Sequence, residues 1–504
     1  MTTEANTNHD NDASEFLLAA EKLAVDLEGD AQAEVISIIA ARYAKLGLVD
    51  HAIELAETIS DPFARNNAFA EIAAASITNG DDSDYAEALL EAIDDPGTRS
   101  VAIEEIAVQY AALGDVDKSL ELASELDDAD PALRRITLIA GTFSPRSIEL
   151  ALSITAPDLR CDTLGQLVDV ALRADRRAEA ALLLAESLRA AREIEFPESR
   201  IYALLSIASL YEKFGDTDRA LEILSGALEL CQSFEGQAPL GLSSSFPRGE
   251  ALTHITESFA RLRHFEQADL AAEQIEDPFQ FAHASTKEAV EFFKAGQIDQ
   301  ALTSLSEALE LVLDEPVYSE QSMLMKDSVL AELAVAFVIV GHLEKGLQVT
   351  EKLSSETQRF RALGEVGKEC ARGGNSRGVF QAAELITNNY SNTSYWLAIT
   401  DVLRESAETE LAHQTLLEAA KSARIIQNNY EKATSLIEVA YRFALLNDSA
   451  EASELFTLAL VTITQLGQDD KKALSLLRID ERFRELNRKP NEEERQLLEQ
   501  IEAG

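Results

Sequence analysis

The segment IAARYAKLGLVDHAIEL at residues 39–55 carries the pattern that decides the fold, because it recurs along most of the chain. Close copies are IAVQYAALGDVDKSLEL at 106–122 and IASLYEKFGDTDRALEIL at 207–224. Each copy has a small residue, an aromatic residue three positions later, and a glycine four positions after that. The first two lie on one face of a helix, and glycine tolerates the left-handed conformation that ends it.

The residues after each turn predict a second helix. A small residue stands five positions beyond the glycine, as at Ala52 and Ala220, where two helices must approach closely. Asp-Pro pairs at 61–62, 95–96, 130–131 and 277–278 combine a helix N-cap with proline at the first helical position. Each copy is therefore predicted to be a helix hairpin. Looser copies surround Gly296, Gly341 and Asn447.

Turn-to-turn spacings are 33 or 34 residues where the repeat is most regular, from Gly47 through Gly80 to Gly114 and from Gly341 to Gly374. These residues resemble the tetratricopeptide repeat (TPR) family, in which small residues, an aromatic residue and a closing proline occur in this order. The resemblance implies an all-α fold, a right-handed superhelical solenoid of antiparallel helix hairpins, with roughly eleven or twelve pairs. Some units depart from it: Asp175 replaces a turn glycine, and His264 follows a turn without one.

Composition limits the function. The 504 residues include 44 Lys and Arg against 89 Asp and Glu, a formal net charge of −45, so we expect no nucleic-acid or membrane partner. The three cysteines lie far apart, which fits a reducing compartment and no disulfide framework. No apolar stretch approaches the roughly 20 residues of a membrane helix, and the N-terminus has no signal-peptide pattern. We expect a cytoplasmic protein.

Five segments are predicted from these patterns. Residues 1–12 form a polar, disordered tail, and 13–234 form an N-terminal helical-repeat block. Residues 235–247, EGQAPLGLSSSFP, form a loop or joint between the two blocks. Residues 248–465 form the C-terminal helical-repeat block, and 466–504 form capping or docking helices.

No enzyme motif is present. The seven histidines include no pair at helical metal spacing, and GLSSS near Gly241 lacks the lysine of a phosphate-binding loop. We therefore predict no catalytic residue, no cofactor and no metal site.

Partner-binding residues are expected on the first helices, which line the inner curve in the resembled family. The Lys and Asn clamp that some members use for a carboxylate terminus is absent at the matching positions. An acidic inner surface favours a protein partner with a basic or apolar segment, while acidity that serves only solubility is the alternative. The candidate positions are Ser37, Ala41, Glu104, Val108, Leu205 and Ser209.

A basic residue stands 15 positions before most turns, often in a Pro-x-x-Arg motif. This position is in the first turn of a helix, where the macrodipole disfavours a cation, so a local partner must compensate. Two roles stay open, a structural ladder of ion pairs or a basic row for an acidic ligand. The residues are Arg65, Arg99, Arg160, Arg200, Arg248, Lys326, Arg359 and Lys432.

The segment DDKKALSLLRIDERFRELNRKP at residues 469–490 reverses the local charge and has an apolar helical stripe. It is predicted either to cap the last repeat or to dock an acidic partner or another copy of the chain, which leaves a homo-oligomer open. The cations at issue are Arg478, Arg482 and Arg484.

Together these observations predict a non-enzymatic scaffold or assembly adaptor that holds a protein segment along its inner surface. The alternative is a signalling sensor whose two blocks hinge at 235–247 when a peptide or small ligand binds.

Overall fold

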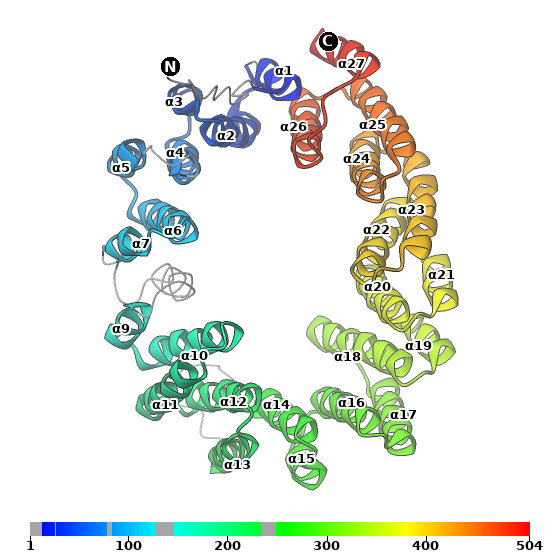
Figure 1. Ribbon diagram of the computed structural model, residues 1–504. Coiled ribbons are helices and arrows are strands. Elements are labelled where there is room, and N and C mark those ends of the chain that lie inside the picture. Colours follow the sequence, from blue (N-terminus) through cyan, green and yellow to red (C-terminus); the bar gives the residue numbers. More distant parts are fainter. Residues whose placement is uncertain are drawn as a thin grey trace, which may run out of the picture. The chain divides into compact units, whose positions relative to one another are not determined.

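The computed structural model describes residues 13–25, 27–77, 83–123, 125–126, 146–233 and 248–503. Every regular element in this part of the chain is a helix (Figure 1). The predicted all-α, TPR-like architecture of antiparallel helix hairpins is confirmed. The predicted tail at 1–12 and joint at 235–247 lie outside the described residues.

The predicted hairpin turns that the structure describes have the left-handed backbone that the pattern requires, and the predicted turn at Gly80 lies outside the described residues. Gly47, Gly215 and Gly341 have φ of 79°, 93° and 90°. Where glycine is missing, the backbone still adopts this conformation, with φ of 56° at Asp175 and 62° at Arg263. The register of the repeat therefore holds even where its sequence signal is lost.

Three of the four predicted Asp-Pro starts act as helix caps, and the fourth, at 130–131, lies outside the described residues. The Asp95 carboxylate accepts a hydrogen bond from Thr98 N at 2.7 Å, and Asp277 accepts one from Gln280 N at 2.8 Å. Each bond satisfies a backbone N–H that has no partner within its helix.

The chain forms two compact units, residues 1–147 with 416–504 and residues 148–415. The first, unit 1, contains α1 (Glu15–Ala24), α2 (Gly29–Lys45), α3 (Val49–Glu57), α4 (Pro62–Ile77), α5 (Ser83–Ala92), α6 (Pro96–Ala112), α7 (Val116–Ala123), α24 (Asn429–Leu445), α25 (Ser449–Thr464), α26 (Asp469–Glu485) and α27 (Glu492–Glu502).

Unit 2 contains α10 (Pro157–Arg173), α11 (Arg177–Glu193), α12 (Pro197–Phe214), α13 (Thr217–Ser233), α14 (Arg248–Arg261), α15 (Phe265–Ala272), α16 (Pro278–Lys294), α17 (Ile298–Asp314), α18 (Glu320–Ile339), α19 (Leu343–Thr350), α20 (Glu356–Arg372), α21 (Ser376–Glu384) and α22 (Asn389–Glu405). The boundaries between the units fall inside α9 (Arg146–Ser153) and α23 (Thr409–Arg424). Helices α13 and α14, on either side of residues 235–247, belong to the same unit.

Within unit 2, each first helix packs against its own second helix and against the first helix of the next hairpin. The pairs α14·α15, α16·α17, α18·α19 and α20·α21 are hairpins, and α14, α16, α18, α20 and α22 form a continuous row. Close approach explains the small residue of the second helix. A Cβ atom at Gly346 would lie 2.6 Å from the backbone oxygen of Ala334 on the paired helix.

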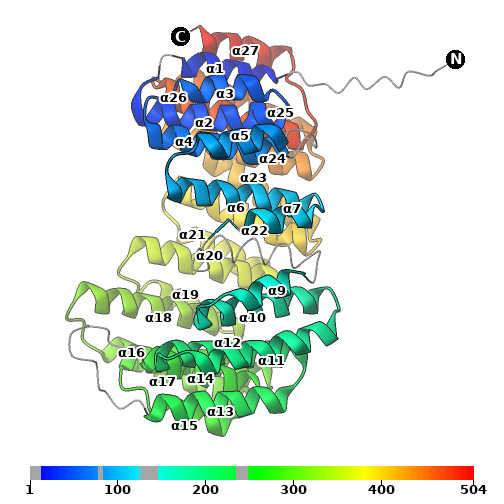
Figure 2. The same ribbon diagram turned by 90° about the vertical axis from the view of Figure 1, so that its left-hand side faces the viewer.

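Within unit 1, the N-terminal helix pairs with a C-terminal one. Helix α1 packs along α26, as α25 packs along α24, while α27 packs against α25 (Figures 1 and 2). The apolar stripe of α26 is thereby covered. Phe16 of α1 and Phe456 of α25 both make edge-to-face contacts with Phe483 of α26, at centroid distances of 5.0 and 4.9 Å.

A buried carboxylate joins the same helices. Asp480 on α26 is fully buried, and its carboxylate contacts Arg42 of α2 at 2.7 Å and Arg484 at 3.0 Å. The Ser14 hydroxyl, which also caps α1 through Leu17 N, donates a hydrogen bond to Asp480. Since a buried charge is tolerated only when paired, these contacts tie α1 and α2 to α26.

Candidate partner-binding groove

A groove of about 400 Å³ crosses the first helices α14, α16, α18 and α20 of unit 2. Half-buried apolar side chains of Val290, Val335 and Ile339 form part of its floor. We call this surface the first-helix groove. Its lining residues are Glu257, Thr286, Lys287, Val290, Glu291, Lys294, Ala331, Glu332, Val335, Ala336, Ile339, Arg361, Ala362 and Glu365.

Helix periodicity explains why these residues reach the surface. Ala331, Val335 and Ile339 are spaced by four along α18 and share one face. The repeat residues Ala334 and Phe337 lie on another face and are buried. A first helix therefore carries two apolar stripes, one in the core and one on the groove floor.

Most charged side chains at the rim are already paired. The ammonium group of Lys294 lies 2.7 Å from a Glu291 carboxylate oxygen, and that of Lys368 lies 2.7 Å from Glu365. Both pairs are spaced by three along a helix and are partly open to solvent, so each contributes little to stability. They leave the groove with a polar rim around an apolar floor.

The Glu332 carboxylate is held by two side chains of α16. An imidazole nitrogen of His283 lies 2.6 Å from it, and the Lys287 ammonium lies 3.3 Å from it. Burial works to raise the pKa of Glu332, but His283 and Lys287 outweigh burial and hold the pKa below its ordinary value. Glu332 is therefore ionised at neutral pH and ties α18 to α16.

Two charged residues of the groove have no such partner. Glu257 on α14 and the exposed Arg361 on α20 make no ion pair or side-chain hydrogen bond with the rest of the described chain. They stand on the first and last of the four helices, and their charges are opposite.

The six residues predicted to bind a partner do not line this groove. Ser37 and Ala41 lie half-buried on α2, and Glu104 and Val108 lie half-buried on α6, all in unit 1. In unit 2, Leu205 is buried on α12 and Ser209 is half-buried. Their role in binding stays a prediction.

The same repeat positions, taken in later copies, do line the groove. The candidate residues stand three positions before and one position after the small residue of each repeat. In the copy at Gly296 these positions hold Thr286 and Val290, and in the copy at Gly341 they hold Ala331 and Val335. The equivalent position on α14 is Glu257. The repeat register would have found these residues if it had been applied to the looser copies, whereas Arg361 has no repeat signal.

The predicted basic row contacts backbone carbonyl groups. Arg160 donates to Ile154 O at 2.9 Å, Arg200 to Ile194 O at 2.9 Å, and Arg359 to Leu353 O at 2.8 Å. Arg99 donates to Leu90 O, and Lys326 donates to Glu315 O at 2.9 Å. The side chains of Arg65, Arg248 and Lys432 show no such carbonyl contact with the described chain.

These carbonyl groups come from the end of the preceding helix or just beyond it, where they have no partner within that helix. A cation here also interacts favourably with the negative end of the helix dipole. Two of the arginines pair with an acid as well, Arg99 with Glu125 at 3.2 Å and Arg160 with Glu193. These contacts occupy side-chain N–H groups that would otherwise be available to bind an acidic ligand.

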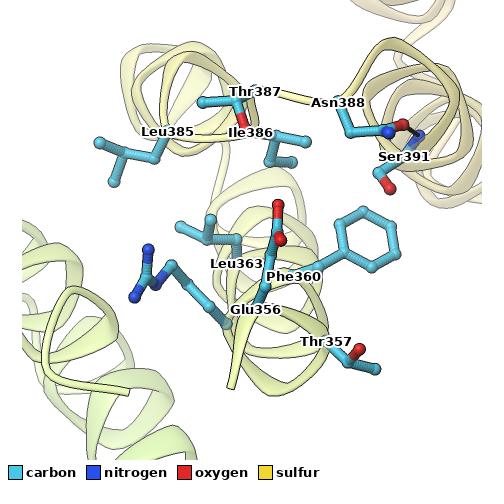
Figure 3. A pocket seen from close by; sticks show the side chains of 10 residues that line it. Glu356, Thr357, Phe360, Leu363, Leu385, Ile386, Thr387, Asn388 and Ser391 are labelled. Carbon is cyan, nitrogen blue, oxygen red and sulfur yellow. Dashed lines mark hydrogen bonds between the residues drawn. The ribbon is translucent and has the colours of Figure 1, made fainter. Parts of the chain in front are cut away.

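A second pocket, of about 350 Å³, lies at such a position (Figure 3). Phe360 and Leu363 of α20 face Leu385 and Ile386 across it, and Arg359 also lines it. Its polar groups serve local structure, because Asn388 caps α22 by accepting from Ser391 N at 3.0 Å. With Glu356 beside its single cation, it does not form an anion site.

The C-terminal cations contact acids of their own chain. Arg482 lies 3.1 Å from Glu438 of α24 and 2.8 Å from Glu485. Arg484 contacts the buried Asp480, while Arg478 is exposed. Docking of another molecule by these residues stays a prediction.

Outside the groove, a buried acid, Glu288 on α16, lies beside the exposed Asp269 on α15. Burial, together with the neighbouring Asp269, raises the pKa of Glu288 on α16 to about 8. Burial also raises the pKa of Asp269 on α15. Helices α15 and α16 belong to successive hairpins, and one Glu288 oxygen lacks a hydrogen-bond partner in the described chain.

Within the described ranges, no three His, Cys, Asp or Glu side chains gather where they could hold a metal ion. No helix in this part of the chain is long and apolar enough to cross a membrane. Cys161, Cys231 and Cys370 are buried free thiols.

Comparison with protein-family models finds no match, and comparison with curated protein sequences finds none either. Among solved structures, the chain is similar to the human IFIT1 dimer with PPP-AAAA, with 11% identity, coverage of 89% of this chain and 95% of that chain, and a TM-score of 0.31. It is also similar to a Rap protein complexed with competence and sporulation factor, with 12% identity, coverage of 74% and 100%, and a TM-score of 0.27.

A third similar structure is a signal transduction ATPase with a tetratricopeptide repeat sensor, from Pyrococcus horikoshii. The identity is 12%, the coverage is 92% of this chain and 70% of that chain, and the TM-score is 0.26. Likeness at these scores carries no inference about the function of this chain, which is drawn below from its own side chains.

Proposed function

We propose that the chain is a non-enzymatic protein–protein interaction scaffold or assembly adaptor that binds a partner segment in the first-helix groove. The observation that carries this proposal is the floor of half-buried Val290, Val335 and Ile339 across successive first helices. Apolar side chains that are partly open to water and framed by polar groups are typical of interaction sites. The groove volume of about 400 Å³ suits the side chains of a bound segment.

The groove chemistry favours recognition over catalysis. The carboxylates of Glu291, Glu332 and Glu365 each form an ion pair with a lysine ammonium group. The Thr286 hydroxyl donates to Ala282 O at 2.7 Å within its own helix and is buried, so it is not available as a nucleophile. These side chains offer shape, apolar area and fixed charge to a partner.

Site-specific photo-crosslinking in the native cell tests the proposal. A photoreactive amino acid replaces Val335 on the groove floor in one variant, and Leu182 in the matched control. Leu182 lies on α11, a second helix of the same unit, and is 56% exposed. We expect a discrete protein adduct from position 335 and no such adduct from position 182.

A second variant, Val335→Arg, places a charge on the floor without touching the buried face of α18. Retained helicity and a lost adduct at a nearby probe position, Ile339, would support the proposal. Identical adducts from positions 335 and 182, or an adduct at 339 that survives Val335→Arg, would refute binding in the groove.

A further inference from the structure

The two unpaired charged residues of the first-helix groove make its two ends electrostatically different. Glu257 is on α14, at one end of the row of four first helices, and Arg361 is on α20, at the other end. Their side chains have no ion-pair partner in the described chain. One end of the groove therefore presents a free carboxylate and the other a free guanidinium.

The other charged groups do not cancel this polarity. Lys287 is paired with Glu332, Lys294 with Glu291, and Glu365 with Lys368. A paired cation and anion present little net charge to a third group. Between the two ends, the surface that an occupant meets is formed mainly by Val290, Val335 and Ile339.

The helix row sets the length of the occupant. Neighbouring packed helices have axes about 8–10 Å apart, so α14 and α20 are separated by at most about 24–30 Å. An extended chain, at roughly 3.3–3.6 Å per residue, spans this distance with about eight residues. Alternate side chains of such a segment would face the floor.

We propose that the occupant of the first-helix groove is an extended peptide segment with a Lys or Arg at the Glu257 end, an Asp or Glu at the Arg361 end, and apolar residues between them. This inference rests on the proposed function and adds the charge pattern of the partner. It differs from the basic or apolar segment that composition predicts, because a guanidinium stands free in an otherwise acidic protein. The acidic remainder of the surface selects against segments that carry anions elsewhere.

A display library of random 12-residue peptides, selected separately against three full-length proteins, tests this pattern. The proteins are the wild type, Glu257→Lys and Arg361→Glu. Both substitutions are on the rim, and circular dichroism checks that the variants keep wild-type helicity. Val335→Arg is the matched control for peptides that bind elsewhere, and only sequences that it fails to bind are counted.

Wild-type selection should enrich peptides with one cation and one anion about eight residues apart. Glu257→Lys should enrich peptides with anions at both ends, and Arg361→Glu should enrich peptides with cations at both ends. For one synthetic wild-type peptide, each charge reversal should weaken binding by about two- to fivefold at low salt, as measured by fluorescence anisotropy.

The same charge pattern from all three proteins would overturn the proposed polarity and leave groove binding intact. Absence of any peptide that Val335→Arg rejects would overturn both proposals. Occupation by a second copy of the chain would also overturn the inference. It would appear as a wild-type dimer in sedimentation that Val335→Arg converts to a monomer.

Discussion

The ion pair between Arg42 and Asp480 should control how firmly the N-terminal helix is held in unit 1. In Arg42→Leu the fully buried Asp480 carboxylate loses a guanidinium at 2.7 Å, and the Leu477 backbone oxygen loses its donor at 2.5 Å. Breaking a buried pair from one side costs about 3–5 kcal/mol. Because Arg484 still contacts Asp480 at 3.0 Å and partly compensates its charge, we expect a cost at or just below the lower limit of this range, ~2–3 kcal/mol.

Hydrogen exchange followed by mass spectrometry measures this change where it occurs. If α1 opens locally, a loss of ~2–3 kcal/mol raises amide exchange in α1 and α26 by roughly 30- to 150-fold, at 1.4 kcal/mol per factor of ten. Peptides from α18 and α20 should exchange at wild-type rates, since these helices belong to unit 2, whereas Arg42 belongs to unit 1.

The control is another ion pair that also joins the two ends of the chain. Arg495 of α27 contacts Glu15 of α1 at 3.0 Å, but their side chains are 42% and 46% exposed. An exposed pair contributes at most about 1 kcal/mol, so Arg495→Leu should raise exchange by less than about fivefold. Equal effects of the two substitutions, or less than a twofold effect of Arg42→Leu, would refute the reasoning from burial.

Three further predictions concern unit 2. Arg200→Met should lower the free energy of unfolding by about 1–3 kcal/mol in urea titrations, because Ile194 O loses a charged donor at 2.9 Å. Arg189→Met is the control: this side chain is 69% exposed, so the free energy of unfolding should change by less than about 0.5 kcal/mol. Similar losses in the two variants would contradict the capping role of Arg200. Glu288 has a pKa of about 8 in the folded chain against 4.5 as its ordinary value, so the folded state binds an extra proton between these pH values and loses stability as pH rises through them. Glu288→Gln should therefore melt at a higher temperature than the wild type at pH 9 and show a much smaller difference at pH 4, and equal differences at both would exclude Glu288 as the cause. Burial raises the pKa of Cys370 to about 11 and also raises the pKa of Cys161 and Cys231. A thiol reagent at pH 8 should therefore modify the native protein far more slowly than the urea-unfolded protein. Equal modification rates would show that these thiols are accessible in the folded chain.

The repeat could be predicted from the sequence because its signals are local. A small residue such as Ala334, the aromatic Phe337 and the turn at Gly341 lie within one hairpin, so their spacing alone sets the helix faces and the turn. Gly346, beyond the turn, follows from the same logic, since its missing Cβ permits close contact with Ala334.

The sequence predicts which repeat positions face a partner, but it does not predict which helices form the groove. Thr286, Val290, Ala331 and Val335 occupy the repeat positions expected to face a partner, but the copies that carry them are loose ones. Periodicity identifies a face on every first helix and does not say on which helices the exposed apolar residues combine into a groove. Arg361 does not occupy one of these repeat positions, so only the structure identifies it as an unpaired cation of the groove.

The spacing of small, aromatic and turn residues established the hairpins, their order and the faces they bury, since each of these depends on residues less than about 40 positions apart. Three-dimensional packing decided which distant segments meet. Helix α1 covers α26, Arg42 meets Asp480, and the Pro-x-x-Arg arginines reach carbonyl groups at the end of the preceding helix. The reason is physical: a local pattern shows that an apolar stripe or a buried charge needs a partner, but many segments of this acidic, repetitive chain satisfy the same need. Only the simultaneous packing of all the helices selects one of them.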